Sequence, residues 1–314
     1  MNNRIKYMDY IFVMRPTLFF PVWTVFLGGY HAKTIFDPGN PWENAVAVHS
    51  ALLVVIAILL SLMMGAIFIF NQITDIETDR KNNKLFFIAN NIINKKNATT
   101  EGTLLAIIAL GIAFIIDYKL GLIFVLIFIS CGIIYSFKPF SWKDKPILGV
   151  IANFLGGWSV AACGWIAAGA SNWKFVVHAI PYAVGLVAVY LLTTLPDIPG
   201  DRSAKKITFG VRYGQKVTIY CAVGFELVTV VLAFLLNDYI LFLPAIAALP
   251  LFLIAAIKQN MNDILRAIKF TVLFASLAVC VKYPAYFAVI VLVFFFSKWY
   301  YRKRFDLEYP RFAA

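Results

Sequence analysis

The strongest constraint on the fold of this chain is a series of apolar stretches that are long enough to cross a lipid bilayer as helices. A membrane-spanning helix needs about 20 mostly apolar residues, and fewer where neighbouring helices shield its ends. Apolar residues make up 61% of the chain and charged residues 14%, against roughly 45–50% and 25% in a soluble domain. We therefore expect an all-α, polytopic transmembrane helical bundle of nine or ten spans, and we exclude a soluble or disordered chain. The ten segments that we interpret as spans are 11–31, 48–70, 102–116, 119–136, 147–169, 175–194, 216–236, 239–257, 265–281 and 284–300.

The charged residues indicate how these spans are oriented. The chain has 28 Lys and Arg residues against 16 Asp and Glu residues. When the loops are assigned alternately to the two sides of the membrane, 24 basic residues share the side of the N-terminus, and only Lys33, Lys119, Lys174 and Lys282 lie on the other. Basic loops stay in the cytoplasm, so we expect both termini there, an even number of spans, and a multi-pass protein of the cell (inner) membrane. The basic excess then indicates a lipid bilayer and an anionic substrate, and no nucleic acid.

The first long polar loop on the basic side begins with Asn71-Gln-Ile-Thr-Asp75-Ile-Glu-Thr-Asp79-Arg80, directly after the second span. If the helix continues through this loop, Asn71, Asp75 and Asp79 lie on one face, because residues four apart are neighbours on a helix. Like charges at this spacing destabilise a helix by roughly 0.2–0.5 kcal/mol. A bound divalent cation would offset that cost, so the motif predicts a metal site.

The second long loop begins with Pro196-Asp197-Ile-Pro-Gly-Asp201-Arg202, directly after the sixth span. The pattern Asp-Ile-x-x-Asp-Arg therefore occurs twice on one side of the membrane, which predicts a parallel duplication whose halves face each other. Pro199 and Gly200 disfavour a regular helix, so here we expect only a tight turn that brings the two aspartates together. Four carboxylates without histidine or cysteine form a hard-oxygen site suited to Mg²⁺. Basic residues beside both motifs would bind phosphate oxygens, so the substrate is expected to be a diphosphate.

On these motifs the chain resembles the UbiA superfamily of intramembrane prenyltransferases over roughly residues 10 to 280. That family carries Asn-x-x-x-Asp-x-x-x-Asp after its second span, and a second Asp-rich motif after its sixth. Further similarity lies in Arg15-Pro16, in Tyr135-Ser-Phe-Lys-Pro and in the Lys143 and Asn153 that follow. The chain departs from the family where Thr194 replaces the first Asp of the second motif, and where Lys84-Leu-Phe-Phe-Ile replaces an Arg-Pro-Leu-x-Ser-Gly segment.

The resemblance implies one domain, 1–314, that transfers a prenyl group from a polyprenyl diphosphate to an apolar or aromatic acceptor in the membrane, with Mg²⁺ as cofactor. The acceptor would be of quinone-precursor, tetrapyrrole or glycerol-phosphate-lipid type. We expect Asp75, Asp79, Asp197 and Asp201 to be catalytic and, together with Asn71, to be the metal ligands. The expected contacts to the prenyl diphosphate are Arg15, Asn71, Lys84, Tyr135, Lys143, Asn153, Arg202 and Lys206.

Two other classes of protein remain as alternatives. A secondary transporter also has internal repeats and charged sites, although such sites usually lie near the membrane midplane. A membrane scaffold would use the basic loops to bind anionic lipid, which leaves the spacing of the aspartates unexplained. Glu226 lies inside a predicted span, a costly position for an acid that often marks function. It is either functional or paired near a helix end.

Overall fold

The computed structural model describes residues 6–36, 45–81, 86–169 and 172–310, all of which are helical or irregular; no strand occurs in these ranges. Nine helices in the described residues are long and apolar enough to cross a membrane, and Tyr118–Ile134 forms a shorter apolar helix. All ten predicted segments therefore coincide with helices, and the protein is a multi-pass membrane protein. Described segments that our sequence analysis left outside the spans also become helical, since α7 begins at Lys95 and α13 at Phe209.

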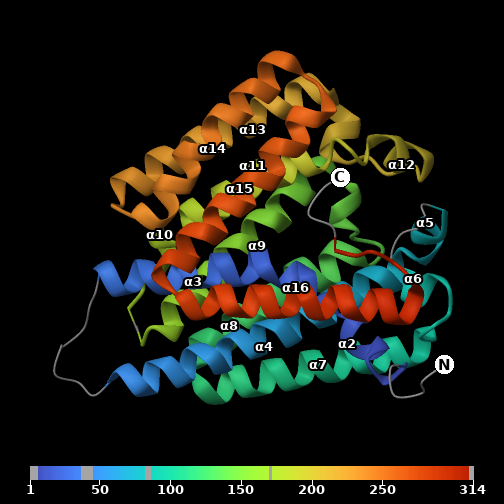
Figure 1. Ribbon diagram of the computed structural model, residues 1–314, viewed down its shortest axis with the longest axis horizontal. Coiled ribbons are helices and arrows are strands. Elements are labelled where there is room, and N and C mark those ends of the chain that lie inside the picture. The colour runs from blue at the N-terminus through green and yellow to red at the C-terminus, as the bar shows by residue number, and fades with distance from the viewer. Residues whose placement is uncertain (1–5, 37–44, 82–85, 170–171, 311–314) are drawn as a thin grey trace.

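The elements follow the order of the predicted spans, with short helices at their ends (Figure 1). The long helices are α3 (Phe19–Phe36), α4 (Ala45–Thr74), α7 (Lys95–Ile116), α9 (Pro146–Ala167), α11 (Ile180–Thr193), α13 (Phe209–Leu235), α14 (Tyr239–Lys258), α15 (Met261–Lys282) and α16 (Pro284–Phe305). The shorter elements are α2 (Asp9–Val13), η1 (Pro16–Leu18), α5 (Ile76–Lys81), α6 (Phe86–Ala89), α8 (Tyr118–Ile127), the π-helix η2 (Phe128–Ile134), η3 (Trp142–Asp144), α10 (Phe175–His178) and α12 (Ile198–Ser203).

Polar side chains mark several helix starts, as helix geometry requires. The first amide groups of a helix have no partner within it, and side-chain oxygens accept their hydrogen bonds. Asn94 accepts from the Asn97 amide at the start of α7, and Asp117 accepts from the Lys119 amide at the start of α8. Because Asp117 is also the residue that ends α7, the chain reverses there in one step.

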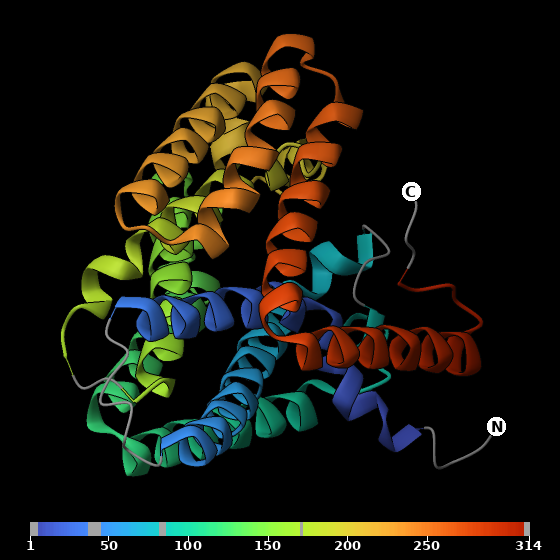
Figure 2. The same ribbon diagram turned by 60° about the vertical axis from the view of Figure 1, so that its left-hand side comes forward.

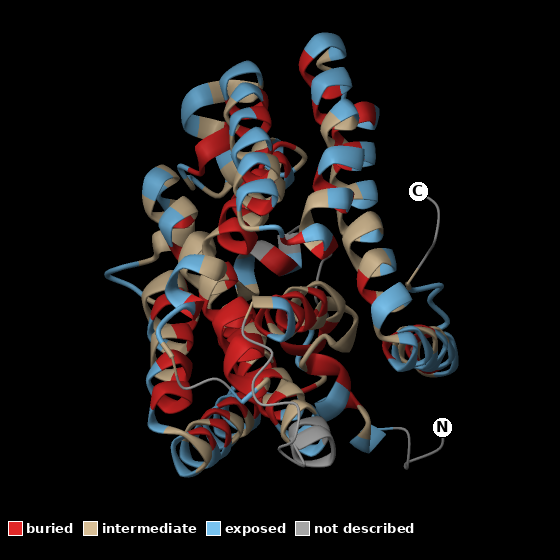
Figure 3. Cartoon of the chain, turned by 90° about the vertical axis from the view of Figure 1, so that its left-hand side faces the viewer, coloured by how far each residue is buried: buried red, intermediate tan, exposed pale blue. Residues whose placement is uncertain are grey.

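Six of the long helices, α9 among them, pack in a closed ring. The α9 helix packs on α3 and α11, α11 packs on α13, α14 lies between α13 and α15, and α15 returns to α3. Gly29 and Gly164 allow the close approach of α3 to α9, since a Cβ at Gly29 would collide with the Ala161 carbonyl and one at Gly164 with the Phe26 carbonyl. Small residues serve this purpose where membrane helices touch. The main cluster of buried apolar residues lies where α3 and α9 pack with α4, α7 and α8, and the outer faces of the helices are largely exposed (Figure 3).

The N-terminal helix α2 and the last helix α16 contact each other at one end of the bundle. The α16 helix leaves α15 at a sharp corner and runs beside the N-terminal elements (Figure 2). Asp9 of α2 accepts hydrogen bonds from Tyr300, at 2.5 Å, and from the Arg304 guanidinium, at 3.0 and 3.1 Å. The α5, α6 and α12 helices lie at the same end in Figure 1, so the two acidic motifs share it.

Candidate functional site

The first acidic motif continues the helical path of α4. The structure has a bend at Asp75 between α4 and α5, yet the Asp75 amide donates to the Asn71 carbonyl at 3.0 Å and the Asp79 amide donates to the Asp75 carbonyl at 2.8 Å. These are the i to i−4 bonds of an α-helix. Asn71, Asp75 and Asp79 therefore follow one another at successive turns, as the spacing predicts.

Two lysines from other parts of the chain converge on Asp75. Lys143 of η3 donates to one carboxylate oxygen of Asp75 at 2.7 Å, and also to Thr74 at 3.0 Å. Lys206, which follows α12, donates to the other Asp75 oxygen at 3.1 Å and lies 3.9 Å from Asp144. Lys206 thus connects the loop of the second motif to the first motif, which brings the two halves of the predicted duplication together.

The electrostatics of this cluster are those of a half-buried ion pair. Burial lowers the pKa of Lys143, and the neighbouring Asp75 carboxylate opposes that effect. Burial also acts to lower the pKa of Lys206, but the carboxylates of Asp75 and Asp144 outweigh it, so the pKa of Lys206 is raised. For Asp79, which is 8% exposed, burial and then the negative charge of Asp75 raise the pKa to about 6. Oxygen Oδ2 of Asp79 has no hydrogen-bond partner among the described residues.

The second motif forms a helical turn, so our expectation that it would be only a tight turn is wrong. The short helix α12 contains the motif, and the Asp201 amide donates to the Asp197 carbonyl at 2.8 Å. Pro199 is compatible with this helix because it lies in the first turn, where its missing amide hydrogen has no intrahelical role. Asp201 accepts a hydrogen bond from Thr208 at 2.9 Å, whereas Asp197 is exposed at the start of the helix. Burial raises the pKa of Asp201, and the Thr208 bond opposes it.

The described residues contain no group of three or more His, Cys, Asp or Glu side chains placed to hold a metal ion. The expected ligands are instead two separate aspartate pairs, one of them with Asn71. This donor set still fits Mg²⁺, which usually binds through one or two carboxylates, waters and substrate phosphates. The unpartnered buried oxygen of Asp79 is a ligand of the required type. The metal-binding role of the five residues stays a prediction.

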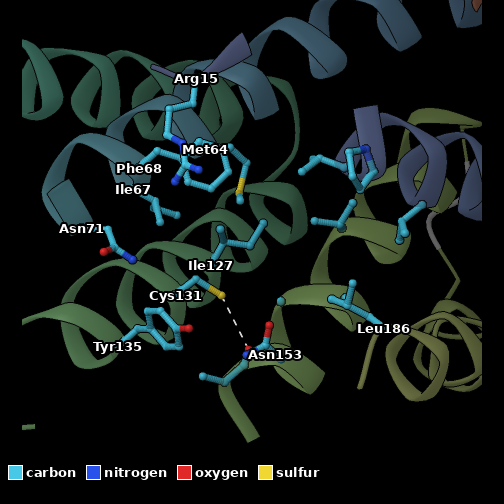
Figure 4. Close-up of a pocket in the computed structure, with 17 residues that line it drawn as sticks. Arg15, Met64, Ile67, Phe68, Asn71, Ile127, Cys131, Tyr135, Asn153 and Leu186 are labelled. Atoms are coloured by element: carbon cyan, nitrogen blue, oxygen red, sulfur yellow. Dashed lines mark hydrogen bonds between the residues drawn. The ribbon is translucent and has the colours of Figure 1, made fainter. Parts of the chain in front are cut away.

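An apolar chamber of about 260 Å³ opens beneath the first motif (Figure 4). Its polar lining residues are Arg15, Asn71, Tyr135 and Asn153, all four of which our sequence analysis selected as substrate contacts. Asn153 donates a hydrogen bond to the Gly149 carbonyl of its own helix at 2.9 Å. The rest of the wall is mostly aliphatic or aromatic, from α3, α4, α8, η2, α9 and α11, and includes Met64, Ile67, Phe68, Ile127, Val160 and Leu186.

Unusual backbone positions Arg15 and Tyr135 in this chamber. Arg15 has a φ of 58°, in the left-handed region that a bulky residue rarely adopts. Its guanidinium lies 5.8 Å from the centre of the Phe68 ring. Tyr135 follows the π-helix η2, whose i to i+5 bonds give a wider turn than an α-helix. Ile127, Cys131 and Tyr135, each four residues apart, all line the chamber as a result.

Two of the predicted basic contacts, Arg202 and Arg80, do not join the cluster in the described structure. Arg202 is exposed on α12, without an ion pair to a described residue. Arg80 donates to the Ala89 carbonyl at 2.7 and 3.1 Å, so its guanidinium fixes the end of α6. Lys84 lies outside the described residues.

Sequence reasoning also missed some residues of the site. Thr74 and Asp144 contact the two lysines, and Thr208 contacts Asp201. The sequence feature that could have indicated Thr74 and Asp144 is their position directly beside selected residues, since Thr74 precedes Asp75 and Asp144 follows Lys143.

The fold and the site define a multi-pass helical membrane protein with an apolar chamber whose polar lining adjoins paired aspartates and lysines. The sequence profile described as "UbiA prenyltransferase family" matches residues 21–267. The chain belongs to the UbiA prenyltransferase family. A search of curated proteins gave no match.

Solved structures have the same fold at low sequence identity. A UbiA homologue from Archaeoglobus fulgidus bound to GPP and Mg²⁺ is 18% identical, with a TM-score of 0.64 over 86% of this chain and 99% of that one. Another structure of a UbiA homologue from that organism is 20% identical, with a TM-score of 0.64 over 91% and 99% of the two chains. A structure described for digeranylgeranylglyceryl phosphate synthase is 18% identical, with a TM-score of 0.64 over 88% and 98%.

Proposed function

We propose that this protein is a Mg²⁺-dependent prenyltransferase that moves a prenyl group from a polyprenyl diphosphate to a lipophilic acceptor within the membrane. The observation that carries the proposal is the position of the apolar chamber, whose polar lining residue Asn71 belongs to the same motif as Asp75 and Asp79. The GPP and Mg²⁺ in the archaeal homologue support the same substrate class. The acceptor would be apolar or aromatic, of quinone-precursor, tetrapyrrole or glycerol-phosphate-lipid type.

Different residues of the site would contact the two parts of the substrate, its diphosphate and its prenyl tail. Lys143 and Lys206 supply positive charge at the motif, where the diphosphate binds, and Arg15 supplies more at the chamber wall. The prenyl tail lies among the aliphatic and aromatic side chains of the chamber. Mg²⁺, held by the aspartates and Asn71, would neutralise the charge that develops on the departing diphosphate.

The reaction breaks the bond between the allylic carbon and the diphosphate oxygen, and the oxygen keeps the electron pair. A nucleophilic carbon or oxygen of the acceptor then bonds to the allylic carbon and loses its proton. The dry, apolar wall keeps water from quenching the allylic cation. Phe68 presents an aromatic ring to this chamber, and aromatic faces attract cations.

The placement of the charged residues also supports the orientation predicted from the loops. Both terminal segments and both acidic motifs share one end of the bundle, and we propose that this end is cytoplasmic, in the cell membrane. A secondary transporter fits less well, because Asp75 and Asp201 lie just outside the ends of long helices, whereas transporter sites lie near the midplane.

The test is Mg²⁺-dependent release of diphosphate from geranyl or longer prenyl diphosphates by the purified protein in lipid nanodiscs, with a broad acceptor panel. We expect Asp75→Ala to lower the rate about a hundredfold or more, the size of losing a group that stabilises developing charge. Glu77→Ala is the matched control, because Glu77 is an exposed acid of the same segment. Equal rates for wild type and Asp75→Ala would remove the support for the proposal.

A further inference from the structure

A second chamber, of about 90 Å³, is lined by α3 and α11, as the first is, and by α13, α14 and α15, which line only the second. The two chambers share three lining residues, Pro21, Val25 and Leu186. A molecule in the second chamber would therefore lie next to a prenyl tail in the first.

Glu226 of α13 is the one ionisable carboxyl in this wall, and it is 1% exposed. Its Oε1 atom is buried and has no hydrogen-bond partner among the described residues. No described lysine or arginine lines this wall to neutralise the carboxyl. Leaving a buried polar atom unpaired is unfavourable, so a ligand that supplies the missing hydrogen bond would recover that free energy.

The other polar groups of the wall already have partners. Thr24 is hydrogen-bonded to Ser276 and Tyr286 at 3.0 and 2.8 Å. Thr229 and Thr271 donate to carbonyl groups of their own helices at 2.9 and 2.6 Å. Tyr182 donates to Asp238 at 2.7 Å. Among these polar groups, Glu226 is the one with an oxygen that a ligand could still hydrogen-bond.

The chemistry of the wall selects among ligands. A charged group of either sign would lose its hydration among the apolar side chains of this wall, which is costly. An uncharged hydroxyl has the smallest desolvation cost and donates the hydrogen bond that the carboxyl lacks.

We propose that the second chamber binds the uncharged, hydroxyl-bearing end of the prenyl acceptor, and that the Glu226 carboxyl accepts its hydrogen bond. The identity of the ligand as an acceptor rests on the proposed prenyl transfer. The binding chemistry rests on this chamber alone, so the two are tested separately.

The probes are 4-fluorophenol, which has the hydroxyl, and 4-fluoroanisole, in which a methyl group replaces its hydrogen. Binding to the full chain in nanodiscs is followed by ¹⁹F NMR, with protein-free nanodiscs as the background for partitioning into lipid. A sealed apolar cavity of about 150 Å³ accepts benzene. The Glu226 chamber is smaller but open, so a phenol ring fits with part of the ring in the opening.

We expect saturable binding of 4-fluorophenol that is about tenfold tighter than that of 4-fluoroanisole, from one hydrogen bond to a buried carboxyl that otherwise lacks a partner. Glu226→Leu should remove this preference, and Glu226→Gln should reduce it. Glu101→Gln is the matched control, since Glu101 is a half-buried acid that also has an oxygen without a partner among the described residues, and it lines neither chamber. Thermal unfolding of each variant establishes that it is folded.

The same titration with saturating geranyl diphosphate and Mg²⁺ distinguishes the two chambers. Phenol binding that survives supports a separate acceptor pocket, and phenol displaced by geranyl diphosphate would place it in the first chamber and overturn the proposal. Equal affinity for the two probes, or wild-type affinity in Glu226→Leu, would also overturn it. If geranyl diphosphate does not bind at all, the proposed function fails while the Glu226 comparison still decides the binding chemistry.

Discussion

At the scale of single residues, Asp75 is the point where three parts of the chain meet. Its own helix, the Lys143 loop and the Lys206 loop are distant in sequence, and both ammonium groups lie within 3.1 Å of its carboxylate. Asp144 lies 3.9 Å from Lys206, so carboxylates balance the two ammonium groups in this structure. A prenyl diphosphate bound at the motif would need these ammonium groups together with Mg²⁺ to offset its negative charge.

Lys143→Gln tests this role. The change keeps most of the length of the side chain but removes the charge and the ion pair to Asp75. We expect the affinity for prenyl diphosphate to fall about ten- to a hundredfold, as for losing a hydrogen bond to a charged group. Lys145→Gln, at an exposed lysine of the same loop, should leave it unchanged. Equal dissociation constants for the two variants in a binding titration would assign Lys143 a structural role only.

At the scale of elements, α9 provides the wall of the first chamber that is easiest to change. A Cβ at Gly156 would meet only the Cys131 sulfur, at 3.0 Å, within a 4 Å radius. Gly156→Val therefore fills chamber space. We expect kcat/KM for geranylgeranyl diphosphate to fall about tenfold or more relative to dimethylallyl diphosphate, from an overpacking cost of about 1–3 kcal/mol.

The control for this change is Gly111→Val on α7, where a Cβ meets nothing within 4 Å. It alters a helical glycine in the same way without touching the chamber. An equal loss for short and long prenyl donors in Gly156→Val would mean that the chamber does not hold the tail.

The turn between α13 and α14 is joined to α11 by Asp238, which accepts the Tyr182 hydrogen bond. Burial raises the pKa of this carboxyl from 3.8 to about 6, although the Tyr182 bond opposes the shift. The folded state then binds the proton more tightly than the unfolded state does. Protonation of Asp238 stabilises the fold at low pH, and this stability is lost as the pH rises through about 6.

We therefore expect Asp238→Asn to be the more stable chain above pH 6, by up to about 3 kcal/mol for a shift of this size. Below pH 4 the two chains should have similar stability. The measurement is the melting temperature of both proteins between pH 4 and pH 8, compared as a difference so that other titrating groups cancel. A difference that does not change with pH would contradict the role of this carboxyl.

At the scale of the whole molecule, the order of the helices could be predicted from the lengths of the apolar stretches. The position of the acidic motifs at the ends of α4 and α11 could be predicted too, because each motif directly follows an apolar stretch in the sequence. The partners of Asp75 could not, since nothing in the sequence indicates which of many basic loop residues reaches it. Lys143 and Lys206 do so, whereas Arg80 bonds a backbone carbonyl. The π-helix before Tyr135 and the helical turn at Pro199 could not be predicted from the sequence either, because packing against other elements determines which type of helix forms over such short segments.

The N-terminal helix α2 contacts both the last helix, α16, and the helix α4 that leads into the first acidic motif. Asp9 pairs with Arg304 of α16, and both side chains are nearly buried. The same N-terminal helix, α2, is tied to α4 by Gln72, which donates to the Val13 carbonyl at 2.8 Å one residue after Asn71. Arg15 follows two residues after Val13. The position of α16 is therefore connected to the wall of the first chamber through α2.

Asp9→Ala should loosen this whole arrangement, because it leaves the Arg304 guanidinium and the Tyr300 hydroxyl without their partner. Removing one member of a buried ion pair costs about 3–5 kcal/mol. We expect a lower melting temperature and faster cleavage by trypsin at the basic residues that end α16. Asp306→Asn is the matched control, since Asp306 is exposed beyond the same helix end with a φ of 55°, which asparagine also adopts. If the two variants melt and are cleaved alike, the pairing of the chain ends does not hold α16 in place.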